Sequence, residues 1–445
     1  MNRRTKFFLS VSIVILLAGS YFLIHKTAPK NTSYFPILLL LAGLDIALWK
    51  SFRTLLKRSA KAFRIPFSIL WWSPAVILVL SLLVSSFLQG YNPSSPVVIY
   101  LMGFVFIMYA SRLVPGLLVL LTSVTGMLIR LTQRMIGRKE TGHALTFKSL
   151  RIVKYAGYGT GAVILVLLTL GMVRWGYDFR IVEHHLTMED LPEAFRGIRI
   201  VQISDIHLGS WPSDAKLETV VSLVNGLAPD LVLFTGDLVN ARTGEADPHK
   251  SVLKKIKAKL GIYTILGNHD YGDYASWESP EAREKNMKEL FSLYDVLGWK
   301  LLRNSHDIIH LGGDSLVVAG AENWSIYNRF ERRGDLDKTM EGASNSAMVI
   351  LMTHDPSHWE EEVVSKYPGI DLTLTGHTHG FQFGIETRYL KWSPVQWLYE
   401  EWAGMYEHHQ KGGNTQFMYV NRGLGAIGYP GRVGIRPEIT LFVLN

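Results

Sequence analysis

The chain of 445 residues contains no cysteine, which excludes disulfide bonds and thiolate metal ligands. Acidic residues are almost missing from residues 1–175, which hold 20 Lys/Arg but only 2 Asp/Glu. The remainder holds 26 Lys/Arg against 36 Asp/Glu, so a charge near +18 is followed by one near −10. This split predicts two regions with different surroundings, and the acidic second region argues against nucleic acid as a partner.

Long apolar runs are present in the first region and predict membrane-spanning helices, which need about 20 apolar residues to cross the hydrocarbon core. The five predicted spans cover residues 7–24, 34–49, 66–88, 97–109 and 156–173. The first run has basic residues before it, as a signal peptide does, but further spans follow, so we interpret it as an uncleaved helix. We interpret residues 113–129 as an interfacial helix, with a sixth span as the alternative.

Basic residues predict the orientation of these spans. Residues 50–64 hold six Lys/Arg and residues 130–154 hold seven, which places both segments and the N-terminus in the cytoplasm. Five spans then place everything after Arg174 on the extracytoplasmic face of a cell membrane, whereas six would place it inside. Only Asp45 and Arg112 interrupt the spans, and we expect Asp45 to snorkel to the surface rather than line a polar path.

From residue 176 the pattern changes to short apolar strands that alternate with helices. Strands are predicted at residues 198–203, 230–234, 262–266, 314–319, 347–352, 372–374, 416–420 and 439–444, and helices at 215–227, 249–260 and 282–296. Alternating units followed by consecutive strands indicate a layered α/β domain with two sheets and outer helices. In such folds the chemistry gathers beyond the strand ends.

A cluster of polar residues follows the end of several of these predicted strands. The central one is Gly267-Asn268-His269-Asp270, and the others are Ser204-Asp205-Ile206-His207, Gly236-Asp237, Thr353-His354-Asp355 and Gly376-His377-Thr378-His379. Carboxylate, imidazole and amide groups suit Mn, Fe or Zn, and strand alternation would direct Asp205 and His207 to the same side. Each cluster alone is usually incidental, but five at strand ends together predict a metal site. Two cations roughly 4 Å apart would generate a hydroxide and stabilise a phosphoryl transfer.

This ordered set resembles the calcineurin-like metallophosphoesterases over about residues 179–445, and Gly423-Leu424-Gly425 with Arg436-Pro437-Glu438 resembles the family's bacterial membrane-associated branch. The resemblance implies a four-layer α/β/β/α sandwich at residues 176–445, and the apolar runs predict an α-helical membrane region of about five helices before it, at residues 1–175. It also implies a binuclear centre of two divalent ions, with Mn, Zn and Fe left open.

Carried over residue by residue, the resemblance implies two overlapping sets of metal ligands and a separate catalytic pair. One metal would be held by Asp205, His207, Asp237 and His379, and the other by Asp237, Asn268, His354 and His377, with Asp237 as the bridge. His269 would contact the phosphoryl oxygens or assist the leaving group, and Asp270 would orient it. The last motif departs from the Gly-Gly-Gln of many relatives, because it continues Gly380-Phe381-Gln382, and this change bears on substrate fit.

The sequence thus predicts a membrane-anchored phosphoesterase in which a metal-bridging hydroxide attacks a phosphodiester or pyrophosphate. Attachment to the bilayer favours a lipid headgroup or lipid-linked phosphate as substrate. Soluble nucleotides are the alternative substrates, and a non-catalytic scaffold with the same fold is the alternative function. A transporter regulated by its phosphoesterase domain is a further alternative, for which the spans supply few polar residues.

An aromatic insert lies between His379 and the last strands, and it contains Trp392, Trp397, Tyr399, Trp402 and Tyr406. The last three recur at helical spacing, which favours a helix packed in the core. A rim that meets lipid or an acyl chain is the alternative, because Trp and Tyr favour membrane interfaces.

Overall fold

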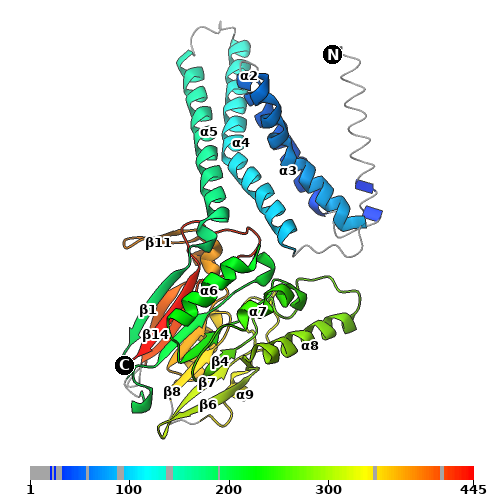
Figure 1. The fold of residues 1–445 in the computed structure, drawn as a ribbon. Helices are drawn as coiled ribbons and strands as arrows, with labels where there is room; N and C mark the ends of the chain where they lie inside the picture. The colour runs from blue at the N-terminus through cyan, green and yellow to red at the C-terminus, as the bar shows by residue number, and fades with distance from the viewer. Residues whose placement is uncertain are drawn as a thin grey trace. The chain divides into compact units, whose positions relative to one another are not determined.

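A computed structural model describes residues 21–22, 25–26, 33–56, 60–87, 95–136, 144–188, 191–343, 348–410 and 415–445 (Figure 1). The chain divides into two compact units. The first comprises Met1–Pro93 and Tyr100–Thr169, and the second comprises Ser94–Ile99 and Leu170–Asn445.

Four long helices in the described part of the chain are long and apolar enough to cross a membrane: α2 (Phe35–Leu56), α3 (Lys61–Phe87), α4 (Pro96–Ile136) and α5 (Ala144–Val173). The predicted span at residues 7–24 lies almost entirely outside the described residues. The expectation of a separate interfacial helix at residues 113–129 is wrong, because α4 continues through Pro115 for 41 residues. At about 1.5 Å per residue this helix is roughly 60 Å long, about twice the thickness of the hydrocarbon core.

A buried ion pair joins the helices of the first unit. Asp45 on α2 is fully buried, and its Oδ1 accepts a hydrogen bond of 2.7 Å from Nη1 of Arg112 on α4. Tyr109 donates to the other Asp45 oxygen at 3.0 Å, and Nη2 of Arg112 donates to the Trp71 carbonyl at 2.9 Å. The expectation that Asp45 snorkels is therefore wrong, because its partners lie inside the helix bundle.

The second unit contains two six-stranded sheets of mixed direction. The first has the order β1 (Arg180–Leu186), β14 (Glu438–Leu444), β2 (Arg199–Ile203), β3 (Leu231–Phe234), β4 (Gly261–Thr264) and β5 (Lys300–Leu301). The second has the order β12 (Gly404–His409), β13 (Thr415–Val420), β9 (Leu372–Thr375), β8 (Met348–Met352), β7 (Asp314–Gly320) and β6 (Ser305–Leu311). The strands β2, β3 and β4 run parallel, as do β7, β8 and β9, so the ends of each set meet at one edge of their sheet.

Apolar residues form three buried layers around these sheets. Neighbouring residues on a strand face opposite sides, so Val201 packs under α6 (Asp214–Gly226), α7 (Lys250–Leu253) and α8 (Pro280–Leu297), while Ile200 packs between the two sheets. On the far side of the second sheet, Val349 and Leu351 pack against Leu336 of α9 (Leu336–Met340) and Val363. These layers make the four-layer α/β/β/α sandwich that the sequence predicts.

Two expected helices differ from the structure. The predicted helix at residues 249–260 is helical only at α7, after the 3₁₀ turn η6 (Thr243–His249). The aromatic insert is not a core helix: it contains the hairpin of β10 (Ile385–Glu386) and β11 (Lys391–Trp392), the 3₁₀ turn η9 (Pro394–Trp397), and then β12. Tyr406 lies in β12, where the partner strand β13 fixes its direction.

Candidate metal centre

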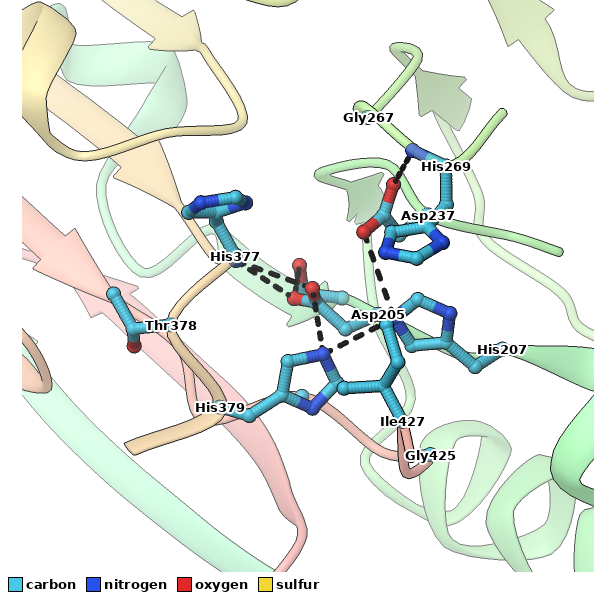
Figure 2. A network of polar contacts seen from close by, with 12 residues as sticks. Asp205, His207, Asp237, Gly267, His269, His377, Thr378, His379, Gly425 and Ile427 are labelled. Carbon is cyan, nitrogen blue, oxygen red and sulfur yellow. Dashed lines mark hydrogen bonds and ion pairs between the residues drawn. The ribbon is translucent and has the colours of Figure 1, made fainter. Parts of the chain in front are cut away.

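All five polar clusters follow the carboxyl ends of parallel strands. Asp205 follows β2, Asp237 follows β3, and Asn268 follows β4 in the first sheet. His354 follows β8, and His377 follows β9 in the second sheet. The side chains from the two sheets meet at the edge of the sandwich, as Figure 2 shows for Asp205, Asp237, His207 and His379.

In three of these clusters the backbone is left-handed rather than extended. Asp205 and His207 both have φ of 48°, Asp237 has φ of 62°, His377 has 68° and His379 has 50°. Asp205 and His207 converge as expected, but strand alternation is not the reason, because the chain has left β2 before either residue. Non-glycine residues seldom adopt this conformation, which costs roughly 1–3 kcal/mol each and is typical of functional sites.

Two glycines permit the close approach of the ligand loops. A Cβ at Gly376 would lie 2.1 Å from Ser204 Oγ and 2.3 Å from Asp205 Oδ2, and a Cβ at Gly267 would lie 2.2 Å from Asp237 Oδ1. All three distances are too short for a real side chain. The glycines at the start of these motifs are thus required by the carboxylates that face them.

One group of candidate ligands comprises Asp205, His207 and His379, all buried. The Nε2 atoms of His207 and His379 lie 3.1 Å apart, and His379 Nε2 lies 3.2 Å from Asp205 Oδ1. Burial opposes ionisation of Asp205, but the adjacent His379 and His354 outweigh it and hold the pKa of Asp205 below its ordinary value. A carboxylate and two imidazole nitrogens that converge in this way fit a divalent cation.

A second group comprises Asp205, Asp237 and His354 and shares Asp205 with the first. His354 Nδ1 lies 2.8 Å from the Thr235 carbonyl oxygen, and its buried Nε2 makes no hydrogen bond although it lies 3.1 Å from Asp237 Oδ2. Burial lowers the pKa of His354, but Asp237 and Asp205 raise it to about 10. The two carboxylates thus stabilise a positive charge near His354 Nε2, and either a proton or a metal ion can provide it. These residues therefore fit a metal ion.

The other two expected ligands, Asn268 and His377, contact each other. His377 Nδ1 lies 2.8 Å from Asn268 Oδ1, and His377 Nε2 lies 2.9 Å from the Tyr399 hydroxyl. Tyr399 donates in turn to buried Asp355 at 3.1 Å. The His377 ring lies beside His354, with 5.1 Å between centroids, but neither ligand group includes His377. Tyr399 was missed as a site residue because its spacing from Trp402 and Tyr406 imitates a helix.

His269 lies beside the ligands without joining either group. Its backbone N–H donates to Asp237 Oδ1 at 2.8 Å (Figure 2). Its Nδ1 lies 2.6 Å from the Asn240 carbonyl oxygen. Burial lowers the pKa of His269. Its ring stacks on Tyr274, with centroids 4.0 Å apart, so carbonyl and stacking contacts fix the orientation of the imidazole.

Asp270 does not orient His269, contrary to expectation. Its carboxylate instead accepts hydrogen bonds of 2.9 Å from the backbone N–H groups of Asp237, Leu238 and Gly267. Burial and the nearby Asp237 carboxylate raise the pKa of Asp270 to about 7. Asp270 therefore positions the loop that carries Asp237, and it acts through that loop rather than on His269.

Arg432 is a fully buried residue at the site that sequence reasoning missed. Its guanidinium donates to the carbonyls of Arg422 at 2.8 Å, Gly423 at 3.0 Å and Gly425 at 2.6 Å, and Nη2 lies 3.3 Å from His379 Nδ1. It therefore fixes both the Gly-Leu-Gly loop and a candidate ligand. An arginine in a loop outside any metal-binding motif gives no signal in the sequence.

Comparisons with known proteins identify the family of this chain. The family model described as calcineurin-like phosphoesterase matches residues 198–381. A metallophosphoesterase of Bacillus subtilis, YkuE, is 33% identical over 268 residues, which cover 59% of this chain and 84% of the relative. The chain belongs to the calcineurin-like phosphoesterase family, whose members use divalent metal ions.

Two further relatives carry more specific names. A transmembrane protein with metallophosphoesterase domain from Danio rerio is 31% identical over 291 residues, which cover 64% of this chain and 61% of the relative. The UDP-2,3-diacylglucosamine pyrophosphatase LpxG of Chlamydia muridarum is 29% identical over 279 residues, which cover 53% of this chain and 81% of the relative. Together with the four apolar helices, the first of these relatives indicates that this chain associates with membranes.

Proposed function

We propose that this chain is a membrane-anchored phosphoesterase that uses two divalent metal ions. The observation that carries the proposal is the pair of buried ligand groups that share Asp205. Asp237 strengthens it, because one of its oxygens lies 3.1 Å from His354 Nε2 and 3.5 Å from His207 Nε2, within reach of both groups. A carboxylate in that position would neutralise and bridge two cations.

The residues divide into two sets of ligands. Asp205, His207 and His379 would hold one ion, with Asp237 completing the set. Asp237 and His354 would hold the second ion. Asn268 and His377, which contact each other in this structure, would turn toward that ion and complete its ligands. The metal stays open among Mn, Zn and Fe, since mixed carboxylate and imidazole donors suit all three.

The reaction would be hydrolysis, in which water attacks phosphorus and the bond from phosphorus to the leaving oxygen breaks. Bound cations would lower the pKa of the attacking water and neutralise charge on the phosphoryl oxygens. His269 is held beside the ligands by Asn240 and Tyr274, and because Nδ1 contacts the Asn240 carbonyl, Nε2 is the nitrogen that would contact the substrate. Because Nδ1–H is donated to the Asn240 carbonyl, Nε2 carries a proton only in the charged form of the ring, which the negative charge of a bound phosphate would favour. In that form Nε2 would donate a hydrogen bond to a phosphoryl oxygen or a proton to the leaving group.

We propose a phosphodiester or pyrophosphate of a lipid as the substrate class. The apolar helices would hold the catalytic unit at the bilayer, and one relative is named as a pyrophosphatase of a diacylated sugar nucleotide. The basic segments at residues 50–64 and 130–154 support an extracytoplasmic catalytic unit in a multi-pass cell-membrane protein.

The test is hydrolysis by the full chain, purified in detergent, stripped of metal and reloaded with Mn²⁺, Zn²⁺ or Mg²⁺. The substrates are a diacyl phospholipid, a lipid pyrophosphate, a soluble nucleotide, and aryl phosphate mono- and diesters. We expect metal-dependent release from the lipid substrates and from the aryl diester.

Two variants make the result specific. Asp237→Asn should lose metal from both sites together with activity, whereas His310→Ala, which alters an exposed histidine on β6, should retain both. Two metals per chain without hydrolysis of any substrate would identify a scaffold. Hydrolysis of the nucleotide alone would refute the lipid assignment.

A further inference from the structure

Large apolar side chains are exposed in the segment between His379, a candidate ligand, and Tyr399. We call them the apolar rim, which comprises Phe381, Phe383, Ile385, Tyr389, Leu390 and Trp397. Tyr389 is 90% exposed, Trp397 72% and Phe381 55%, although burial would stabilise each of them by roughly 1.5–3 kcal/mol. So many exposed large apolar side chains within one short segment indicate an interaction site.

The pattern of burial in residues 381–385 is inverted. Phe381, Phe383 and Ile385 are exposed, whereas Gln382 and Gly384 between them are buried. Gln382 explains the inversion, because its Nε2 donates to the carbonyls of residues 429 and 431 at 2.8 and 2.9 Å. The polar side chain thus anchors the segment inward, and the apolar ones are directed outward.

Phe381 adopts a backbone conformation that favours glycine. Its φ is 59°, and Gly380 and Gln382 on either side have φ of 52° and 57°. A left-handed residue with a side chain costs about 1 kcal/mol relative to glycine. The chain therefore keeps an exposed phenyl ring at a position where glycine would stabilise the fold, which points to a use for the ring.

The end of helix α5 identifies the bilayer as the occupant of this surface. This helix is a candidate membrane span, and at its end the Gly171 carbonyl accepts a hydrogen bond from the Arg432 N–H at 3.2 Å. The next residue, Val433, pairs with Phe383 and accepts from the Gly384 N–H at 2.9 Å. Within the second compact unit, the apolar rim is thus joined to the end of a membrane span by two consecutive residues.

The charges of the hairpin also suit a lipid surface. Arg388 is exposed, whereas the Lys391 ammonium donates to the Ala403 carbonyl and lies over the Trp402 ring. The one acidic residue in the hairpin, Glu386, is paired with Arg422. The hairpin therefore presents positive charge within a region whose net charge is negative. Basic residues beside aromatic ones favour the headgroup layer of anionic membranes.

We propose that the apolar rim inserts into the headgroup and acyl boundary of the bilayer. Because Phe381 lies two residues from His379, a lipid that enters along the rim would bring its phosphate to the metal centre; this last clause rests on the proposed function, whereas the insertion does not. Aromatic and aliphatic side chains in such surfaces are buried roughly 5–10 Å into the boundary.

The absence of native cysteine makes the test direct, because one introduced cysteine is a unique attachment point for a spin label. Tyr389→Cys and Trp397→Cys are labelled in the full chain in vesicles of phosphatidylcholine and phosphatidylglycerol. Lys285→Cys is the control, since this side chain on α8 is 78% exposed in the same unit. We expect the two rim labels to be accessible to oxygen but shielded from a water-soluble nickel complex, and the control to be accessible to nickel.

Rim labels as accessible to nickel as the control label would overturn the proposal. Labels shielded from both oxygen and nickel would overturn it too, because they would show a protein partner or a second copy on the rim. These accessibility measurements do not depend on activity, so they test membrane insertion separately from the proposed function.

Phe381→Gly provides a second measurement. It should raise the thermal unfolding midpoint or leave it unchanged, since it relieves the left-handed strain. It should lower hydrolysis of a vesicle phospholipid several-fold and leave hydrolysis of an aryl phosphodiester unchanged. An equal loss on both substrates would instead place Phe381 in the reaction itself.

Discussion

His269 is the residue whose role the structure separates most clearly from that of a metal ligand. It lies outside both ligand groups and is held by the Asn240 carbonyl and the Tyr274 ring. We expect His269→Ala to keep its metal content and to lose roughly 10²–10⁴-fold in turnover, as for a positioned acid–base group. The loss should be smaller for an activated aryl diester than for an alkyl diester, which needs more protonation of its leaving group.

The matched variant for this prediction is His354→Ala. It removes the nitrogen that faces Asp205 and Asp237, so metal content and rate should fall together. Elemental analysis alongside the two rates checks both variants. If His269→Ala lost one metal ion per chain, that residue would be a ligand, and full activity would make it structural.

We expect the buried side chain of Arg432 to stabilise the fold as well as the candidate metal site. Arg432→Met leaves the buried carbonyls of Arg422 and Gly425 without their donor, whereas the Gly423 carbonyl keeps the Glu438 N–H, and each such loss costs about 1–3 kcal/mol. We expect a markedly lower thermal unfolding midpoint in detergent and weaker metal binding at the group that contains His379.

The control is Arg436→Met, which removes a surface ion pair with Asp178 at 2.8 Å. Exposed ion pairs contribute about 0–1 kcal/mol to the free energy of unfolding, so the thermal unfolding midpoint of Arg436→Met should stay near that of the native chain. Equal effects of the two substitutions would contradict the structural role of Arg432.

The sequence was sufficient to predict which residues gather at the candidate site, but not their backbone conformation or their hydrogen-bond partners. Apolar strands followed by Asp, Asn and His signal strand ends, and parallel strands bring such ends together. The left-handed backbone at Asp205 and His379 could not be foreseen, because only the crowding of the loops against Gly376 and Gly423 requires it. The partners of Asp270 depend on the same loops and were assigned wrongly.

Among the elements, the ion pair between α2 and α4 gives the clearest prediction. Asp45→Leu leaves the Arg112 guanidinium buried without its carboxylate, which costs about 3–5 kcal/mol. The double variant Asp45→Leu with Arg112→Leu removes both charges and should be more stable than the sum of the single losses. Tyr109→Phe removes one hydrogen bond and should cost only about 1 kcal/mol.

The measurement is a double-mutant cycle on thermal unfolding of the full chain in detergent. Additive losses would show that the pair is not coupled. A double variant as unstable as Asp45→Leu alone would show that the helices need Asp45 for another contact.

Most elements with strong periodicity were predicted within a few residues, such as α8 and β14. The failures share a physical cause. Strand β12 is half-exposed and edges its sheet, so it lacks the apolar alternation of a buried strand, and its aromatic residues imitate helical spacing. Strand β6 is an edge strand as well, and it was not predicted because it begins with the polar residues Ser305, His306 and Asp307. Residues 113–129 continue α4 because Pro115 is accommodated within it, which the sequence does not reveal.

At the scale of the whole molecule, the side of the membrane on which the catalytic unit lies can be measured through introduced cysteines. The basic segments predict that Lys285→Cys reacts with an impermeant maleimide in intact cells. Lys50→Cys should react only after lysis, and the cysteine-free native chain is the blank. Protection of Lys285→Cys in intact cells would place the unit in the cytoplasm, where nucleotide-linked lipids are the available substrates.

The contact at the end of α5 has a mechanical consequence. The Gly171 carbonyl binds the Arg432 backbone, and the Arg432 side chain reaches to 3.3 Å from His379 Nδ1, so one residue links a membrane span to a candidate metal ligand. A helix of 30 residues adapts to thinner or thicker bilayers by tilting. Tilt at its end would pull on Arg432, and turnover in vesicles should therefore vary with acyl-chain length even at constant substrate. The enzyme would then respond to the thickness of the membrane as well as to its composition.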